Sequence, residues 1–376
     1  MRFVDSLSMV KHLLVWCPVP DSPQTNIQTS QVLSAMIGLA APIALGLAVG
    51  HGRIGMAASL GGLFLSGSGN GESLREQMPD LLYALGAGCL AMFVGSMICG
   101  DGITALCAMT AVAAIAALVG GITRPMARAS ARFILFSIVA AHALHGAAHP
   151  FGATILFLVG AVWTAVLSLA LRPLFQALNI DRLLPGYATP LLPTRYSWRQ
   201  LLQRWAKSLL QISGWRYTLR ITLSLLVAGG YSMLLPRHHG YWALITVGIV
   251  VHRDIRATLR RTVERAAGTA VGALLASLVG ATLSSNLVVV AAIAVLAAAR
   301  PILREMNYTA YAAVQTPLVI LLLDFDRVPS AGLIFDRLAA TLVGCVVALI
   351  FGYLGWHKVP ASAPTRSMNG CRSGSG

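Results

Sequence analysis

Two arginines stand at the start of similar apolar stretches that are far apart in the chain. Arg265 opens RAAGTAVGALLA (265–276), and Arg337 opens RLAATLVGCVVA (337–348). An ionisable side chain drawn toward a bilayer is energetically costly and usually faces a cavity or a partner. Because a guanidinium binds a carboxylate through two parallel hydrogen bonds, the pair predicts gates for an anion that enters from one side and leaves from the other.

The neighbours of these arginines support two interpretations. Arg261 and Thr269 flank Arg265 on the same stretch and are included in the predicted binding site. Glu264 and Asp336 directly precede Arg265 and its counterpart. Ion pairs with these acids, or snorkelling of the guanidinium groups to the membrane surface, are therefore the alternative explanation.

A Thr-Pro pair interrupts the apolar run YAAVQTPLVILLLD (311–324). Proline inside a helix removes a backbone hydrogen bond and clashes with the preceding turn, at a cost of roughly 3 kcal/mol. Carbonyls freed in this way are tolerated within a membrane only where protein or a water-lined cavity receives them. We therefore expect a polar pocket near the proline, and an ordinary helix kink is the alternative. The residues predicted to line the pocket are Thr246, Gly248, Gln315, Thr316 and Pro317.

The titratable residues do not single out a proton relay. The candidates for proton coupling are Asp254, Asp324 and Asp336. Three histidines, His142, His145 and His149, follow i, i+3, i+7 spacing, which fits an exposed helix end better than a metal-binding or pH-sensitive cluster. No P-loop and no paired cysteine motif occurs, so we expect neither a cofactor nor a structural metal.

The composition indicates a membrane protein. Of the 376 residues, 56% are hydrophobic and only 11% are charged, whereas a soluble protein carries about 25% charged residues. Long apolar runs recur along the chain, which predicts an all-α polytopic membrane protein. We expect no signal peptide in the first 30 residues, where Phe3, Leu7 and Leu14 fit one face of an interfacial helix.

The positions of the basic residues predict the topology. The twelve apolar segments lie near 31–49, 54–69, 80–98, 103–121, 132–148, 152–171, 219–235, 240–252, 266–283, 287–299, 308–323 and 332–355. With a cytoplasmic N-terminus, only Arg53, Arg237, Arg327 and Arg337 of the 28 lysines and arginines fall on the far side. That asymmetry follows the positive-inside rule and places both termini in the cytoplasm. The net charge of +15 is therefore explained by topology, not by nucleic-acid binding.

The predicted organisation has five parts. They are a cytoplasmic N-terminal segment with an amphipathic helix (1–30), a first six-helix membrane half (31–171), a basic cytoplasmic linker (172–218), a second six-helix half (219–355) and a disordered cytoplasmic tail (356–376). In the linker, Trp198, Leu202 and Trp205 share one helical face, and Arg199 and Lys207 point elsewhere. We expect this helix to lie on the anionic cytoplasmic leaflet, and packing on the protein's own loops is the alternative.

Two kinds of internal repeat are visible. RPMARAS (124–130) and RPILREM (300–306) occupy equivalent places in the two halves, which suggests a duplication. Within the second half, 241–254 matches 311–324, and the stretch after Arg265 matches the stretch after Arg337. The matched pairs include Tyr241 with Tyr311, Ala243 with Ala313, Thr246 with Thr316, Thr269 with Thr341 and Gly272 with Gly344.

The predicted topology runs the matched segments through the membrane in opposite directions. The sequence therefore predicts inverted three-helix repeats in the second half. Many secondary transporters have this architecture and bind substrate near the midplane, where the repeats meet. Chance similarity between segments rich in Ala, Val, Leu and Gly is the alternative.

Three stretches carry a resemblance to a known family. HHGYWALITVGIVVHRDIRATLRRTVERAAGTAVGALLASLVG (238–280), NYTAYAAVQTPLVILL (307–322) and RLAATLVGCVVALI (337–350) resemble the FUSC family, which includes fusaric acid resistance proteins and aromatic carboxylic acid exporters. The Gly-Tyr-Trp-Ala opening, the Arg-x-x-Gly-Thr-x-x-Gly helix start and the Thr-Pro segment carry it over roughly 219–355. The first half is similar only in its pattern of segments.

The resemblance implies export of small, often aromatic, organic anions across the bacterial inner membrane, beside a periplasmic adaptor and an outer-membrane channel. Large family members carry a sizeable soluble domain between the halves, where this chain has only the linker. We predict a proton-linked efflux transporter that lies in the lipid bilayer, that is not an enzyme and that binds no nucleic acid. A homo-oligomer is compatible with this prediction. A passive anion channel, a structural membrane protein and an enzyme acting on lipid are the alternatives.

Overall fold

The structure, a computed structural model, describes residues 27–66, 74–98, 100, 102–143, 149–178, 182–184, 197–234, 240–282, 285–323 and 331–356. The predicted N-terminal amphipathic helix and the tail beyond Trp356 lie outside these residues. Within the described part, thirteen α-helices account for almost all of the regular structure. Two very short strands, β1 (Ile27–Gln28) and β2 (Arg182–Leu184), form an antiparallel pair that the sequence did not predict.

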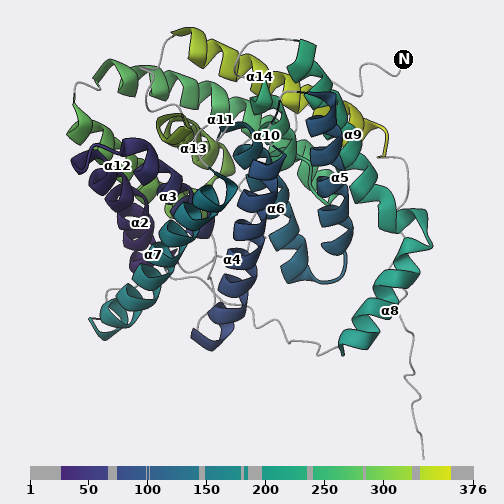
Figure 1. The fold of residues 1–376 in the computed structure, drawn as a ribbon, viewed down its shortest axis with the longest axis horizontal. Helices are drawn as coiled ribbons and strands as arrows, with labels where there is room; N and C mark the ends of the chain where they lie inside the picture. Colours follow the sequence, from purple (N-terminus) through teal and green to yellow (C-terminus); the bar gives the residue numbers. More distant parts are fainter. Residues whose placement is uncertain are drawn as a thin grey trace, which may run out of the picture.

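Each apolar segment predicted from the sequence contains a helix (Figure 1). The first half comprises α2 (Thr29–Ala48), α3 (Gly52–Leu65), α4 (Leu74–Met97), α5 (Ile103–Val119), α6 (Arg124–Ala143) and α7 (Pro150–Ala177). The second half comprises α9 (Ile212–Leu234), α10 (Tyr241–Val250), α11 (Ile255–Thr282), α12 (Asn286–Met306), α13 (Tyr308–Leu323) and α14 (Ala331–Leu349), which the π-helical turn η1 (Ile350–Leu354) extends. The prediction of an all-α polytopic protein is confirmed, and the number of membrane crossings stays a prediction.

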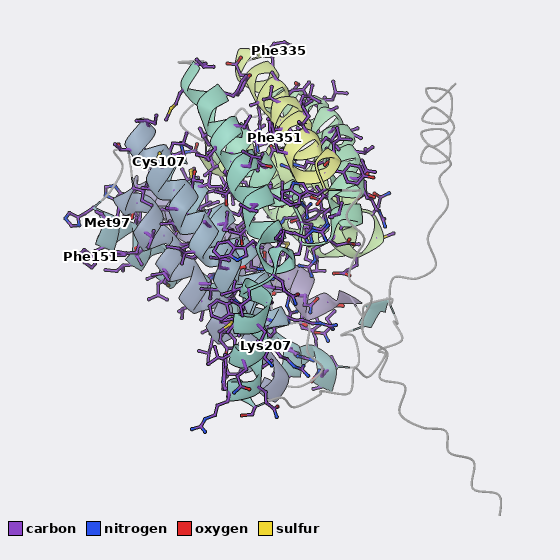
Figure 2. All side chains as sticks on the ribbon, turned by 90° about the vertical axis from the view of Figure 1, so that its right-hand side faces the viewer. Met97, Cys107, Phe151, Lys207, Phe335 and Phe351 are labelled. Atoms are coloured by element: carbon purple, nitrogen blue, oxygen red, sulfur yellow. The ribbon has the colours of Figure 1, made fainter. Side chains whose placement is uncertain are left out.

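The surface of the bundle is apolar, as expected of a protein that faces lipid. Among the described residues, four helical stretches are long and apolar enough to cross a membrane: Thr29–Ala48, Pro150–Ala177, Asn286–Met306 and Phe335–Leu354. Large apolar side chains such as Met97, Phe151 and Phe335 are more than half exposed at the rim of the bundle (Figure 2). Soluble monomers rarely expose so much contiguous apolar surface. The chain is a multi-pass membrane protein.

The second half consists of two helix triplets, the first formed by α9, α10 and α11 and the second by α12, α13 and α14, and helices of one triplet pack against helices of the other. The second helix of each triplet packs against the third helix of the other, so α10 lies on α14 and α13 lies on α11. The two third helices, α11 and α14, pack against each other between them. This reciprocal contact is what a local two-fold relation between the triplets produces.

The first half is built in the same way. Its second helix α3 packs on its last helix α7, its fifth helix α6 packs on its third helix α4, and α4 packs on α7. The halves then meet through equivalent pairs, with α2 on α12, α5 on α9, α3 on α13 and α6 on α10. The duplication predicted from the Arg-Pro fragments therefore has a counterpart in the packing.

One close backbone contact recurs in each of these exchanges. A Cβ added to Gly272 on α11 would lie 2.6 Å from the Ala313 carbonyl oxygen and 2.7 Å from Thr316 Cβ. A Cβ added to Gly344 on α14 would lie 2.8 Å from the Ala243 carbonyl oxygen and 2.7 Å from Thr246 Cβ. These are the residue pairs that the sequence repeat matched, with the partners exchanged. Only glycine lets two helix backbones approach so closely.

The first half repeats this contact with other side chains. A Cβ at Gly95 would lie 2.5 Å from the Ser137 carbonyl oxygen and 2.7 Å from Ala140 Cβ, and a Cβ at Gly160 would meet the Ala58 carbonyl. Ser137 stands at the same distance in sequence from RPMARAS as Ala313 does from RPILREM. The short fragment thus marks structurally equivalent helices, α6 and α13.

The linker helix α8 (Trp198–Leu209) lies at the edge of the bundle (Figure 1). Ser197 and Gln200 form a capping box at its start, and none of its residues is buried. Trp205 contacts the bundle, because its Nε1 donates a hydrogen bond to the carbonyl of Leu118 at the end of α5, at 3.0 Å, and Trp215 Nε1 of α9 donates to the carbonyl of Leu209, at 2.8 Å. On the apolar face of α8, Trp198 and Leu202 are exposed, whereas Leu201 and Leu209 are half-buried.

Candidate functional site

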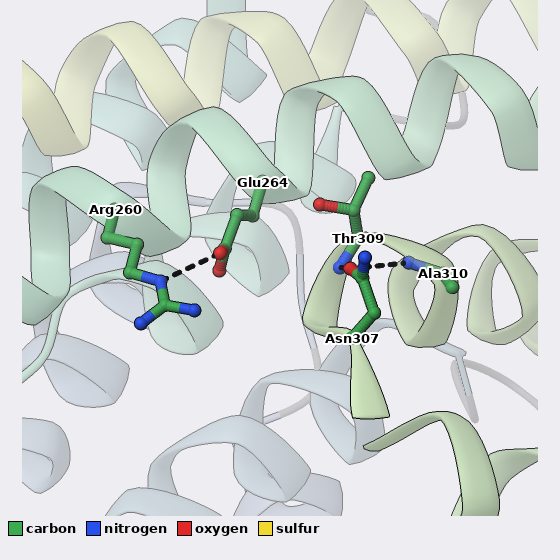
Figure 3. A network of polar contacts seen from close by, with 5 residues as sticks. All are labelled: Arg260, Glu264, Asn307, Thr309 and Ala310. Atoms are coloured by element: carbon green, nitrogen blue, oxygen red, sulfur yellow. Dashed lines mark hydrogen bonds and ion pairs between the residues drawn. The ribbon is translucent and has the colours of Figure 1, made fainter. Parts of the chain in front are cut away.

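Both arginines that the repeat singles out are buried in the protein. Arg265 is 4% exposed and Arg337 is 3% exposed. The acid before Arg265 is engaged elsewhere, since Glu264 accepts a hydrogen bond from Arg260 Nε at 2.8 Å (Figure 3). The guanidinium of Arg265 therefore does not snorkel to the surface, and it lies instead among residues of α13.

A cationic and aromatic cluster surrounds Arg265. We call it the α11–α13 cluster, and it consists of Arg261, Arg265, Arg300, Tyr308 and Tyr311. Arg261 lies 5.2 Å from the ring centroid of Tyr308, Arg300 lies 5.9 Å from that of Tyr311, and the two rings are 5.8 Å apart. Arg265 interacts electrostatically with both tyrosines. A cation and the face of an aromatic ring attract each other, so the two tyrosine rings help to hold several positive charges in one place.

Local chemistry places the cluster. Asn307 begins α13 by accepting hydrogen bonds at Oδ1 from the backbone N–H groups of Thr309 and Ala310, at 2.8 and 3.4 Å (Figure 3). This cap fixes the first turn, which carries both tyrosines. From α12, Arg300 Nη1 donates to Ser66 Oγ at the end of α3, at 2.9 Å. The first half of the chain therefore helps to position a residue of the cluster.

Several buried donors and acceptors near the cluster have no hydrogen-bond partner among the described residues. They are Arg265 Nε, Arg300 Nε, Tyr308 Oη, Thr269 Oγ1 and Gln315 Oε1. Buried polar groups are nearly always hydrogen-bonded, and a buried unpaired charge is especially unfavourable. Four of these five atoms are N–H or O–H donors, and two of the four belong to guanidinium groups. The arrangement suits an anionic acceptor.

The threonines predicted to line a pocket are used within their own helices. Thr246 Oγ1 donates to the Trp242 carbonyl at 2.8 Å, and Thr316 Oγ1 donates to the Ala312 carbonyl at 2.9 Å. In the exchanged contact, the Cβ and methyl group of Thr246 face Gly344, and the Cβ and hydroxyl group of Thr316 face Gly272. In the structure these two threonines therefore pack at the points where the helices cross.

The proline does not break its helix. α13 runs continuously from Tyr308 to Leu323 through Pro317, which is buried. The missing N–H of Pro317 frees the Ala313 carbonyl, and that oxygen lies against the backbone of Gly272. A Cα–H group at this position offers a weak donor. The freed carbonyl is thus received by the partner helix.

The middle helices of the two triplets scarcely touch each other. α10 packs against α14, α9, α6 and α11, whereas α13 packs against α11, α12 and α3. Gly248 accordingly faces the first half, because a Cβ there would lie 3.6 Å from Ile138 Cδ1 on α6. The structure brings Gln315, Arg261, Arg265 and Thr269 together at one interface and leaves Gly248 at another.

Arg337 lies in a second cluster, which we call the α10–α14 cluster and which consists of Arg337, Trp242, Tyr241 and His142. The guanidinium of Arg337 lies 3.7 Å from the ring centroid of Trp242. Tyr241 lies 4.9 Å from Trp242, and the His142 ring stacks on Tyr241 at 5.6 Å. As in the other cluster, a helix of the first half contributes, in this case α6.

The acidic candidates lie apart from the α11–α13 cluster or outside the described residues. Asp254 is exposed in the turn between α10 and α11, and Asp336 is half-buried beside Arg337. Asp324 and His145 lie outside the described residues. Among the described residues, no three His, Cys, Asp or Glu side chains gather in a way that could hold a metal ion.

A buried arginine that the sequence analysis missed joins several elements at one end of the bundle. Arg220 on α9 donates from Nε to the Gly352 carbonyl at 2.5 Å and from Nη2 to Thr258 Oγ1 at 2.8 Å. Arg253 in the neighbouring turn donates to the Ala117 carbonyl of α5 at 2.7 Å. Both guanidinium groups have protein acceptors, so this Arg220 junction is structural.

The sequence carried weak signals for the residues that were missed. Arg300 stands in the repeated Arg-Pro fragment, and Tyr311 matches Tyr241 in the inverted repeat. Arg300 was assigned no role, because basic residues outside the apolar segments were interpreted as topology signals. Tyr311 was matched in the repeat without being assigned a role.

Comparison with known proteins supports the resemblance seen in the sequence. The family described as fusaric acid resistance protein-like matches residues 226–351, which contain both clusters apart from His142. The match covers about a third of the chain, and over these residues the chain is similar to that family, which relates it to membrane transport. No curated protein and no solved structure matches the chain.

Proposed function

We propose that this protein exports small organic anions, aromatic carboxylates in particular, across the bacterial inner membrane, with both termini in the cytoplasm. The observation that carries the proposal is the α11–α13 cluster, in which Arg265 and Arg300 are buried beside aromatic rings and retain unpaired donors. A carboxylate would satisfy such donors, and an aromatic ring would pack against Tyr308 or Tyr311.

The relation between the two triplets supports a direction of movement. Arg265 and Arg337 occupy equivalent positions, and the predicted topology assigns them to the cytoplasmic and periplasmic sides. We propose that the anion binds first at the α11–α13 cluster and leaves past the α10–α14 cluster. Inverted repeats favour this behaviour, because exchanging the conformations of the two triplets moves access from one side to the other.

We further propose that export is linked to protons. Asp336 is the described candidate that suits this role, because it is half-buried and directly precedes Arg337. Protonation of this carboxyl would change the charge around the proposed exit. Export against a concentration gradient that collapses with an uncoupler is the expected result, whereas a passive channel would equilibrate the anion whether or not the uncoupler is present.

Transport in vesicles tests the anion site. Purified protein reconstituted into liposomes is given a radiolabelled aromatic carboxylate such as benzoate, and uptake is compared between Arg265→Gln and the parent. Because a hydrogen bond to a charged group contributes about 1.5–3 kcal/mol, we expect the substrate affinity to fall about 10- to 100-fold. Arg265→Lys keeps the charge but not the fork of donors, and should retain part of the activity.

The matched control lies one turn away on the same helix. Arg260 is exposed and already paired with Glu264, so Arg260→Gln should transport like the parent. If a folded Arg265→Gln protein also transports like the parent, Arg265 does not bind the substrate and the proposed site is wrong.

A further inference from the structure

Buried arginines in this chain have different surroundings. At the Arg220 junction the guanidinium donates to two acceptors on other elements, Gly352 and Thr258. In the α10–α14 cluster the guanidinium of Arg337 lies directly over the Trp242 ring. Arg265 is equally buried, yet its Nε has no acceptor among the described residues.

The surroundings of Arg265 are also strongly positive. Arg261 and Arg300 join it from α11 and α12. Glu264, which directly precedes Arg265, is paired with Arg260, and Glu305, in the last turn of α12, is paired with Arg304. Several guanidinium groups confined in a low-dielectric interior repel one another unless a negative charge lies between them.

The unpaired donors come from different helices. Arg265 Nε belongs to α11, Arg300 Nε to α12 and Tyr308 Oη to α13. Arg261, one turn before Arg265 on α11, lies 5.2 Å from the Tyr308 ring centroid, Arg300 lies 5.9 Å from the Tyr311 ring centroid, and the two rings are 5.8 Å apart, so the three donors lie in one region. A carboxylate prefers two parallel donors from one guanidinium, whereas a spherical ion accepts donors from several directions.

We propose that the α11–α13 cluster holds a small inorganic anion, chloride, whenever no organic substrate occupies it. The inference deepens the proposed function, on which it rests for the displacing ligand. Chloride neutralises the arginines in the substrate-free protein and is displaced when the organic anion binds. The two ligands therefore compete for the same donors.

Thermal unfolding tests for the ion itself. The full-length protein in detergent is heated in sodium gluconate and in sodium chloride at equal ionic strength. With chloride about tenfold above its dissociation constant, we expect the melting temperature to rise by about 2–4 °C. The rise should vanish in Arg265→Gln and in Arg300→Gln and persist in Arg260→Gln. An unresponsive parent, or equal responses in all four proteins, would overturn the proposal.

A milder variant covers the case in which loss of an arginine prevents folding. Tyr308→Phe removes one unpaired donor and leaves every charge in place. Chloride should then stabilise the variant several-fold more weakly, as judged by the concentration needed for half of the shift. An unchanged chloride titration in Tyr308→Phe would contradict the assignment of Tyr308 as a ligand.

Competition separates this inference from the proposed function. In the parent, benzoate should bind several-fold more weakly in chloride than in gluconate, and this difference should vanish in Arg300→Gln. Transport that is intact but insensitive to chloride overturns the ion site alone. Chloride stabilisation that depends on Arg265, in a protein that transports no organic anion, supports the ion site and overturns the proposed function.

Discussion

The α11–α13 and α10–α14 interfaces have the same kind of helix crossing but differ in the residues beyond it. At each crossing a glycine of the third helix meets a carbonyl and a threonine of the opposite second helix. Beyond the crossing, α11 places Gly268 against Ala312, so that α13 packs closely, whereas α14 faces the large ring of Trp242 at the matched position. The two interfaces thus have the same backbone contact and different side chains around it.

This difference separates what holds the fold from what binds a ligand. The shared glycines fix how near the helices approach, and both interfaces need them alike. The divergent residues decide how each buried arginine is satisfied, by an aromatic face for Arg337 and by an added anion for Arg265 in our proposal. Each contribution can be altered separately.

The largest expected effect comes from filling the shared crossing. Gly272→Ala and Gly344→Ala place a Cβ within 3 Å of a carbonyl oxygen, so one backbone must move. We expect each substitution to lower the free energy of unfolding by about 1–3 kcal/mol, to a similar extent at both interfaces. Thermal unfolding in detergent, followed by size-exclusion chromatography, measures the change.

The control for this prediction is Gly230→Ala on α9, where an added Cβ meets nothing within 4 Å. Alanine is the better helix former, so this variant should be as stable as the parent or slightly more stable. Equal stability of Gly230→Ala and Gly272→Ala would mean that the crossing tolerates a methyl group and does not hold the triplets together.

A smaller effect should follow from changing the divergent end. Trp242→Leu removes the ring under Arg337, an interaction that contributes about 1–2 kcal/mol when shielded from water. We expect export to slow by about 5- to 30-fold while the substrate affinity, which we propose the α11–α13 cluster sets, changes little. Initial rates in proteoliposomes over a range of substrate concentrations distinguish the two effects.

Two variants sharpen this test. Trp242→Phe retains an aromatic face, and the Trp242 indole N–H has no hydrogen-bond partner in the part of the chain that the structure describes, so export should stay near the parental rate. Trp163 on α7 is 40% exposed on the apolar surface, so Trp163→Leu should leave export unchanged. A Trp242→Leu protein with parental kinetics would show that Arg337 needs no aromatic partner.

The smallest effect concerns the turn that leads into α11. Burial and, to a smaller extent, the charges of Arg261, Arg220 and Arg253 together lower the pKa of His252 to about 4, with Asp254 opposing the decrease. In the unfolded chain the pKa lies near 6.5. Between these values the unfolded chain binds a proton that the folded protein does not, so stability falls as the pH drops from about 6.5 toward about 4.

The measurement is the melting temperature at pH 7 and at pH 5. The parent should lose a few degrees more than His252→Gln, which cannot titrate. Identical losses in the two proteins would indicate that His252 is solvated in the folded state and that other groups govern the acid response.

The sequence predicted the helices well. Apolar runs locate helices directly, since each must satisfy its own backbone in lipid. The recurrence of Arg265 and Arg337 at equivalent positions singled out these two buried arginines, with snorkelling to the membrane surface as the alternative, whereas Arg220 and Arg300 were missed. The same repeat matched Gly272 with Gly344, although it did not indicate that each glycine would contact the other triplet.

What the sequence could not predict is which neighbours each helix has. Gly248 was expected beside the Thr-Pro segment and instead faces α6, because an apolar helix such as α10 has no polar side to indicate its orientation. Arg300 was missed for a related reason. Its role depends on α12 approaching both α13 and the end of α3, a contact between residues more than 200 positions apart.

The exchange of partners also constrains how the chain can be made. α3 leaves the ribosome long before α7, and α10, with only ten residues, precedes α14. The ten residues of α10 fall short of the about 20 that a full span takes, so this helix depends on neighbouring helices for its place in the membrane. Until the last helix of a half is inserted, its second helix lacks its main support. We therefore expect a chain that stops before α14 to be recognised as unfinished and degraded.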